Sequence, residues 1–214
     1  MKNIGILHII TDITIQSQFT HNQLAEMAIA GGADTIQFRQ KNGSTRQHIE
    51  MLELVKSVCT INSVPLIVND HAGIAIAMEV DGVHFGQDDM PISLAKKILP
   101  SDMIIGASAR TEDKIMDAIA SGADYIGFGP VFHTNSKVDA EKAKGLDTLK
   151  HICQIASCPV IAIGGITKET TYEVIKRGAH GIAVISAVCA SPNPKQATQS
   201  LLTEIQRGKQ DMVT

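Results

Sequence analysis

A short glycine-containing junction recurs along this chain of 214 residues and constrains its fold more than any other feature. The junction occurs as Gly32-Ala33-Asp34, Gly122-Ala123-Asp124 and Gly178-Ala179-His180, each time after a helical stretch and before an apolar run. Because glycine suits the left-handed backbone position that ends a helix, each junction predicts a helix that leads directly into a strand. We therefore expect strand and helix to alternate along the chain.

The apolar runs and the periodic stretches between them define this alternation. Strands are predicted at 5–11, 35–39, 65–69, 81–85, 102–107, 125–129, 159–163 and 181–185. Helices are predicted at 20–31, 45–60, 71–78, 91–98, 111–121, 145–156, 168–177 and 192–207. Apolar strands without alternation are typical of parallel strands covered by helices. The pattern predicts an α/β fold with a single domain over residues 1–214, a (β/α)8 TIM barrel whose catalytic face lies at the carboxyl ends of the strands. A doubly wound sheet is the alternative, but it seldom uses eight strands in so short a chain.

The composition argues against nucleic acid and membrane as partners. The net charge is −3 without a basic cluster, and no apolar run approaches the roughly 20 residues of a membrane helix. The apolar start of the chain lacks a small-residue cleavage site, so we expect a first strand there rather than a signal peptide. The cysteines form no Cys-x-x-Cys pair, which favours free thiols in a reducing cytoplasm.

Two aspartates follow neighbouring predicted strands. Asp70 ends the run 65–70, and Asp89 follows the run 81–85. Either side chain could instead cap the helix that follows it. Consecutive strand ends lie side by side on the catalytic face of a barrel, however, so the two carboxylates could share one cation. Oxygen ligands without a His/Cys cluster favour Mg²⁺ over zinc.

Two cationic side chains lie at the end of the strand predicted at 35–39. Gln37, Arg39 and Lys41 are spaced by two residues, so their side chains point the same way, into the barrel mouth. The two cations could pair with surface carboxylates. A buried Arg nevertheless needs an anionic partner, and its bidentate fork suits a phosphate. Acidic metal ligands beside Arg and Lys predict a site for a diphosphate.

The loops after the last three predicted strands suit a second anion. The polar stretch 133–144 is either a linker-like loop or a lid that grips phosphate. Gly164-Gly165 and Ile185-Ser186 end the next two strands, where barrels commonly bind phosphate through backbone N–H groups. Two anion sites imply two phosphorylated substrates.

The histidines show no catalytic constellation with Ser, Cys or Asp in the sequence. His84 lies within an apolar strand, so we expect a packed, hydrogen-bonded core residue rather than a catalyst. Surface or junction positions are expected for five others, namely His8, His21, His48, His151 and His180.

Over nearly its whole length the chain resembles thiamine phosphate synthases. The matching segments are Ile9-Ile10-Thr11-Asp12, Gln37-Phe38-Arg39-Gln40-Lys41, Leu66-Ile67-Val68-Asn69-Asp70, Gly82-Val83-His84-Phe85-Gly86-Gln87-Asp88-Asp89, Gly106-Ala107-Ser108, Gly127-Phe128-Gly129-Pro130-Val131-Phe132, Thr134-Asn135-Ser136-Lys137, Gly164-Gly165-Ile166-Thr167 and Ile185-Ser186-Ala187.

The resemblance implies a Mg²⁺-dependent transferase of thiamine biosynthesis. The family condenses 4-amino-2-methyl-5-hydroxymethylpyrimidine diphosphate with 4-methyl-5-(2-hydroxyethyl)thiazole phosphate, which gives thiamine phosphate and pyrophosphate. By resemblance, Mg²⁺ is held by Asp70 and Asp89. The residues implied for the pyrimidine diphosphate are Gln37, Phe38, Arg39, Gln40, Lys41, Asn69, Ser108 and Lys137. Those implied for the thiazole phosphate are Thr134, Asn135, Ser136, Gly165, Ile185 and Ser186. Catalysis is expected to rest on Arg39, Lys41, Lys137 and Ser108, which stabilise the departing diphosphate.

The chain departs from the usual family pattern at two positions, and two other functions remain as alternatives. The family usually has Pro where His133 stands and commonly His where Arg110 stands.

A related thiazole tautomerase typically carries a catalytic His in place of Pro130 and lacks the metal-binding aspartates. A non-catalytic barrel that binds thiazole phosphate would have no use for a diphosphate site. The sequence does not determine the oligomeric state, so a homodimer stays open.

Overall fold

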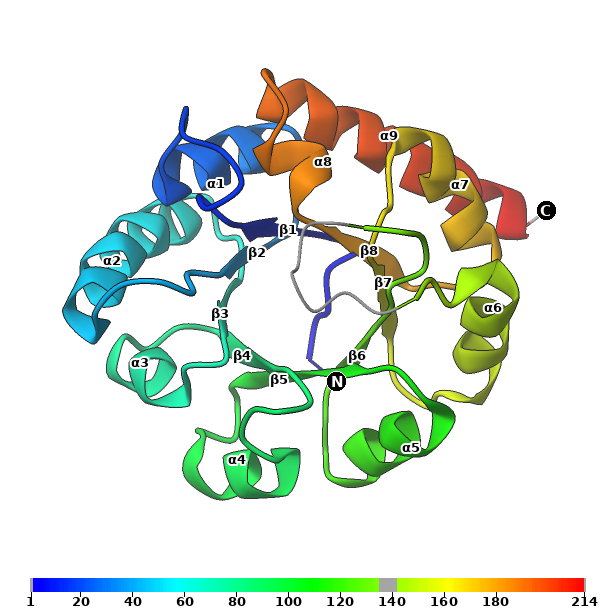
Figure 1. Cartoon of the computed structure of the whole chain (residues 1–214), viewed down its shortest axis with the longest axis horizontal. Helices are drawn as coiled ribbons and strands as arrows, with labels where there is room; N and C mark the ends of the chain where they lie inside the picture. The colour runs from blue at the N-terminus through cyan, green and yellow to red at the C-terminus, as the bar shows by residue number, and fades with distance from the viewer. Residues whose placement is uncertain (1, 135–141, 214) are drawn as a thin grey trace.

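The strands form a closed barrel in chain order. The structure, a computed structural model, describes residues 2–134 and 142–213. Its strands are β1 (Leu7–Thr11), β2 (Thr35–Phe38), β3 (Leu66–Asn69), β4 (Gly82–Phe85), β5 (Ile104–Ala109), β6 (Tyr125–Phe128), β7 (Val160–Ile163) and β8 (Gly181–Val184). Each strand pairs in parallel with the next, and β8 pairs with β1 (Figure 1). The prediction of a (β/α)8 TIM barrel is confirmed, and the doubly wound alternative is excluded.

The helices form a ring around the barrel (Figure 1). Their bounds are α1 (His21–Ala30), α2 (Thr45–Ile61), α3 (Ala72–Ala77), α4 (Ile92–Ile98), α5 (Glu112–Ala120), α6 (Gly145–Ile155), α7 (Lys168–Lys176), α8 (Ser186–Cys189) and α9 (Pro194–Val213). Every predicted helix is present. The short helix α8 was not predicted, and α9 runs to residue 213 rather than 207.

The recurring junctions have the predicted backbone conformation. Gly32, Gly122 and Gly178 have φ angles of 96°, 98° and 96°, in the left-handed region that favours glycine. The N–H of Gly32 donates to the carbonyl of Ile29 at 2.9 Å, which closes the last turn of α1. Each junction glycine follows the last residue of its helix by two residues and precedes the next strand by three.

The two sides of the strands face different surroundings, because side chains alternate along a strand. Outward residues such as Ile36, Val83 and Phe128 are fully buried against the helices in the main apolar core. Inward residues such as Ile10 and Ile161 belong to a second, smaller apolar cluster inside the barrel. The inside therefore has fewer apolar residues than the outside, and polar residues take up part of it.

The barrel closes at the seam between β1 and β8. Leu7 pairs with Ile182 across this seam. Helix α9 packs against α7, α8 and α1, so the carboxyl-terminal helix covers the junction between the first and last units (Figure 1). The two ends of the chain thereby depend on each other for packing.

Two further expectations concern the whole chain. The four cysteines are free, as predicted. None of the helices in the described ranges combines the length and the apolar character needed to cross a bilayer.

Candidate active site

One cavity opens at the carboxyl ends of β2 to β6 and extends into the barrel. Predicted site residues that line it are Gln37, Arg39, Lys41, Asn69, Asp70, Asp89 and Ser108. The rest of its lining is His8, Ile10, His84, Gly86, Gln87, Asp88, Arg110, Tyr125, Gly127, Ile161, Ile163 and Ala183. Segments that are far apart in the sequence therefore meet in one cavity, as the barrel topology predicts.

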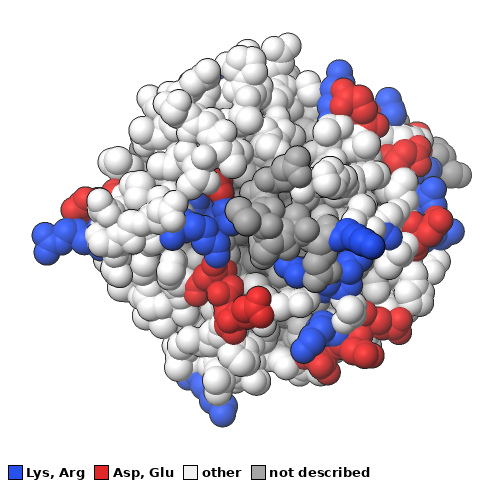
Figure 2. All heavy atoms as spheres, in the orientation of Figure 1, with Lys and Arg blue, Asp and Glu red and all other residues white. Residues whose placement is uncertain are grey.

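Charges of both signs gather at the mouth of this cavity. The Nζ atom of Lys41 lies 2.6 Å from Oδ2 of Asp70, and the Asn69 amide donates to the other Asp70 oxygen. Asp89 accepts a hydrogen bond of 2.7 Å from the N–H of Gly86. Figure 2 shows acidic and basic side chains next to one another beside the centre of the barrel. Such a mixed cluster can bind an anion and a cation together.

The two aspartates are close enough to influence each other. Burial raises the pKa of Asp89, and its contact with the Asp70 carboxyl raises that pKa further. A carboxylate whose charged form is disfavoured by a neighbouring carboxyl group is stabilised when a cation binds beside it. The pairing predicted from their positions after β3 and β4 is therefore present in the fold.

Asp70 has an uncommon backbone conformation. Its φ angle is 66°, in the left-handed region where residues other than glycine are rare. The backbone N–H of Asp70 donates to the carbonyl of His84 at 2.9 Å, which holds this conformation in place. Such a conformation costs free energy, and it persists only where the surrounding structure enforces it. Residues held in this way are found most often at functional sites.

The donor set fits Mg²⁺ and does not fit zinc. Within residues 2–134 and 142–213 no three His, Cys, Asp or Glu side chains gather in a way that could hold a metal. Zinc sites normally need three or four such protein ligands. Mg²⁺ is usually held by one or two carboxylates together with phosphate oxygens of the ligand and water. The two carboxylates of Asp70 and Asp89 match the number of ligands that a protein usually gives to such a site.

Arg39 has a protein partner that the sequence did not reveal. Its guanidinium forms an ion pair with Asp12, which is only 1% exposed at the end of β1. The Thr14 hydroxyl also donates to Asp12, at 2.6 Å. The Nε atom of Arg39 is buried and has no hydrogen-bond partner among the described residues. Asp12 thus fixes the guanidinium, while at least one donor stays available for a ligand.

The predicted residues Phe38 and Gln40 do not line the cavity. Phe38 faces outward into the main core and packs on the His21 ring, with centroids 4.6 Å apart. The Gln40 side chain pairs with His21 at 3.0 Å and donates to the carbonyl of Asn42 at 2.7 Å. Both residues alternate with Gln37, Arg39 and Lys41, so strand geometry turns them away from the cavity.

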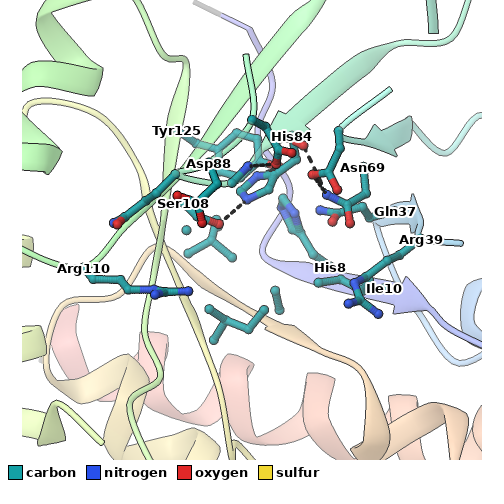
Figure 3. A pocket seen from close by; sticks show the side chains of 18 of the residues that line it. His8, Ile10, Gln37, Arg39, Asn69, His84, Asp88, Ser108, Arg110 and Tyr125 are labelled. Atoms are coloured by element: carbon teal, nitrogen blue, oxygen red, sulfur yellow. Dashed lines mark hydrogen bonds between the residues drawn. The ribbon is translucent and has the colours of Figure 1, made fainter. Parts of the chain in front are cut away.

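Deeper in the barrel, Tyr125, His84 and Ser108 form a hydrogen-bonded chain (Figure 3). His84 lies 3.0 Å from the Tyr125 hydroxyl through Nδ1 and 2.8 Å from the Ser108 hydroxyl through Nε2. The prediction that His84 is packed and hydrogen-bonded is confirmed. The sequence showed no Ser/His constellation, because 24 residues separate these two side chains. The third member is a phenol rather than a carboxylate, so the chain lacks the group that stabilises an imidazolium in a hydrolytic triad.

Three histidines predicted at surface or junction positions are buried instead. The exposed fractions of His8, His21 and His48 are 2%, 1% and 5%. His21 is held by the Thr11 hydroxyl at 2.8 Å, and His48 contacts the carbonyl of Asn42 at 3.1 Å. His21 and His48 stand among polar residues, where the sequence gives no signal of burial, whereas His8 stands in an apolar run like that of His84. A surface position is therefore wrong for all three, whereas His21 does lie at a junction, as the first residue of α1, and His8 lines the cavity.

The described residues among those predicted for a second anion follow β6, β7 and β8. Gly165 has a φ angle of 64°, and a side chain there would collide with Phe132 and the backbone of His133. Ile185 is buried and precedes α8, which begins with the exposed Ser186. Thr134 is partly buried, whereas Asn135 and Ser136 lie outside the described residues, as does Lys137 of the predicted diphosphate site. The structure therefore brings part of this predicted site to neighbouring strand ends and leaves the rest undescribed.

Comparisons with known proteins agree on one family. The family model described as thiamine monophosphate synthase matches residues 7–188. A thiamine-phosphate synthase of Salinibacter ruber is 49% identical over 197 residues, which cover 92% of this chain and 87% of that protein. The thiamine-phosphate synthase of Chloroflexus aurantiacus is 42% identical over 195 residues, covering 91% of this chain and 90% of that protein.

A solved structure has nearly the same fold. The thiamine phosphate pyrophosphorylase of Pyrococcus furiosus superposes with a TM-score of 0.87 at 36% identity, over 95% of this chain and 96% of that one. A geranylgeranylglyceryl phosphate synthase of Thermoplasma acidophilum superposes with a TM-score of 0.71 at 16% identity, which shows a shared fold alone.

Proposed function

Because this chain belongs to the thiamine monophosphate synthase family, we propose that it joins the aminopyrimidine diphosphate to the thiazole phosphate, forming thiamine phosphate and pyrophosphate. One observation carries the proposal: the carboxylate pair of Asp70 and Asp89 meets Lys41 and Arg39 at the mouth of a single cavity. This arrangement suits the diphosphate, which is the group that the reaction must bind and release.

Charged side chains would provide most of the binding of the diphosphate. Lys41 and Arg39 would bind the negatively charged oxygens, and Asp70 and Asp89 would hold Mg²⁺. Mg²⁺, when bound, supplies further neutralisation of the charge that grows on the leaving diphosphate. Asp12 keeps the Arg39 guanidinium in place before the ligand arrives, which lowers the cost of ordering it.

The pyrimidine ring would occupy the interior of the barrel. The cavity continues inward from the charged mouth past Ser108 to His84 and Tyr125. A substrate whose diphosphate is held at the mouth would direct its ring toward these side chains. The Ser108 hydroxyl lies between the two regions, where it can donate to a diphosphate oxygen.

The chemistry needs no general base. The thiazole nitrogen is a neutral nucleophile, and its lone pair forms the new bond to the methylene carbon of the pyrimidine. The bond from that carbon to the diphosphate oxygen breaks, and its electron pair leaves with the diphosphate. No proton moves in this step, so positioning and electrostatic stabilisation are the main contributions of the protein.

The family's other chemistry is less well supported here. A tautomerase is expected to carry a catalytic His at the position of Pro130 and to lack the aspartate pair, yet Pro130, Asp70 and Asp89 are all present. A barrel that only bound thiazole phosphate would have no use for the charged mouth. The four free cysteines suit a reducing compartment, so the proposal includes a cytoplasmic enzyme.

The test measures pyrophosphate release with both substrates, with each alone, and with Mg²⁺ removed by a chelator. We expect release only with both substrates and Mg²⁺. Asp70→Asn and Asp89→Asn should each lower kcat by about 100-fold or more, comparable with the loss of one preorganised contact to the leaving charge. Asp113→Asn, an exposed position in the first turn of α5, is the matched control and should retain full activity. Absence of pyrophosphate release with both substrates would contradict the proposed function, and full activity of both aspartate variants at limiting Mg²⁺ would contradict the metal assignment.

A further inference from the structure

His8 occupies an unusual position inside the barrel. It lies on β1 with its side chain turned inward, where it lines the cavity and is only 2% exposed. Its ring meets the Tyr125 ring edge-on, with centroids 5.4 Å apart and planes at 67° (Figure 3). Neither the site predicted from the sequence nor the mechanism above uses this residue.

The hydrogen bond to one ring nitrogen of His8 determines the state of the other. Nε2 lies 3.0 Å from the carbonyl oxygen of Gly5. A carbonyl can only accept, so Nε2 carries the hydrogen. Burial lowers the pKa of His8 to about 4, which keeps the ring neutral near pH 7. Nδ1 therefore bears a lone pair and acts as an acceptor.

That acceptor has no partner in the described part of the chain. Nδ1 of His8 is fully buried without a hydrogen bond. Buried polar groups are nearly always paired, because an unpaired one destabilises the folded protein. A buried acceptor that lines a ligand cavity points to a donor on the ligand.

The expected substrate carries an N–H donor on its ring, which is the end of the molecule that would lie near His8. Its diphosphate belongs at the mouth, beside Lys41 and Asp70, so its ring lies toward the interior where His8 is found. Gln37 lines the same part of the cavity from β2 and is 4% exposed, so a second polar group faces the ring. The amino group of the pyrimidine is the N–H donor that the His8 acceptor lacks.

We propose that Nδ1 of His8 accepts a hydrogen bond from the amino group of the pyrimidine ring and thereby selects for an amino-substituted ring over an oxo-substituted one. The inference rests on the proposed function. An oxo group at the same ring position would bring a second acceptor against the His8 lone pair, leaving both unpaired. Sites built around a hydrogen bond discriminate strongly against analogues that cannot make it.

Calorimetric titration tests the proposal with two ligands, the aminopyrimidine diphosphate and its 4-oxo analogue, each with Mg²⁺ and without thiazole phosphate. We expect the wild-type protein to bind the amino ligand about 10- to 100-fold more tightly. His8→Phe keeps a ring of similar size and removes the acceptor, so its preference should fall to about threefold or less. His8→Gln restores an acceptor and should recover part of the preference.

His180→Phe is the matched control. His180 also contacts a backbone carbonyl through Nε2, that of Ile4 at 2.8 Å, and lies at the start of β8 outside the cavity. This variant loses the same kind of contact and should retain the wild-type preference. Thermal unfolding of each variant checks that it is folded before titration.

The outcomes separate this inference from the proposed function. If the wild-type protein binds the amino ligand and releases pyrophosphate while His8→Phe keeps the full preference, His8 is not the acceptor and the inference is wrong. If the wild-type protein neither binds the amino ligand nor releases pyrophosphate, the proposed function fails together with the inference. If His8→Phe does not fold, His8→Leu, which also lacks the acceptor, takes its place: a preference of about threefold or less supports the inference, and a preference equal to that of the wild-type protein overturns it.

Discussion

Replacing His8 should change how the stability of the protein depends on pH. Burial lowers the pKa of His8 from 6.5 to about 4 in the folded protein. In the unfolded chain the imidazole is solvated and titrates near its ordinary value. Between these two pH values the unfolded chain binds a proton that the folded protein excludes, so the free energy of unfolding falls as the pH falls.

The size of the effect follows from the two pKa values. The full difference corresponds to about 3 kcal/mol, of which about 2 kcal/mol is lost by pH 5. Above pH 7 the imidazole is neutral in both states, and His8 contributes nothing to the pH dependence. His8→Phe lacks the titrating group and should show none of this loss.

Urea unfolding at pH 8 and pH 5 measures the effect. The free-energy difference between His8→Phe and the wild-type protein should shift by about 2 kcal/mol in favour of the variant at pH 5. Ile36→Val, which trims a fully buried apolar side chain without a titrating group, should give the same difference at both pH values. A wild-type-to-His8→Phe difference that is equal at pH 8 and pH 5 would refute the reasoning, because His8 would then titrate alike in both states.

Three further predictions concern the site and its supports. Arg39→Gln leaves Asp12 buried without its ion pair and should lower the free energy of unfolding by about 3 kcal/mol in urea titrations. Gly106→Ala would place a methyl group 2.5 Å from Cε1 of the Tyr125 ring, so we expect a lower melting temperature and a loss of about 1–3 kcal/mol of stability. Lys137→Ala should lower kcat more than it raises either KM in steady-state assays, because its charge matters most while the diphosphate departs.

The fold was predictable because its signal is repeated. Eight apolar runs, each flanked by a helical stretch, leave few parallel architectures open, and three junctions repeat the same glycine chemistry. The short helix α8 was missed because four residues are too few to display a helical period. The bounds of the other elements differ by a few residues, since neither period nor capping residues define the last turn of an element sharply.

The site was predictable where its residues share a strand end or a spacing of two. Gln37, Arg39 and Lys41 line one cavity because alternation along β2 is a local property. Contacts between distant segments left no such signal: the pairs Arg39–Asp12 and His84–Ser108 form only when the barrel closes. Phe38 and Gln40 were predicted from the family motif that they share with their neighbours, although alternation along the chain turns both away from the cavity.

The seam between β1 and β8 affects the order in which the chain can finish folding. The pairing of Leu7 with Ile182 joins residues separated by most of the polypeptide, so this contact cannot form until the last unit has left the ribosome. At about 5–20 residues per second, β1 waits on the order of ten seconds or more for its partner. During that time the free edge of β1 can pair with another nascent chain. Helix α9, which packs over α1 and α7, follows β8 in the sequence, so this edge is covered only after β8 has been synthesised.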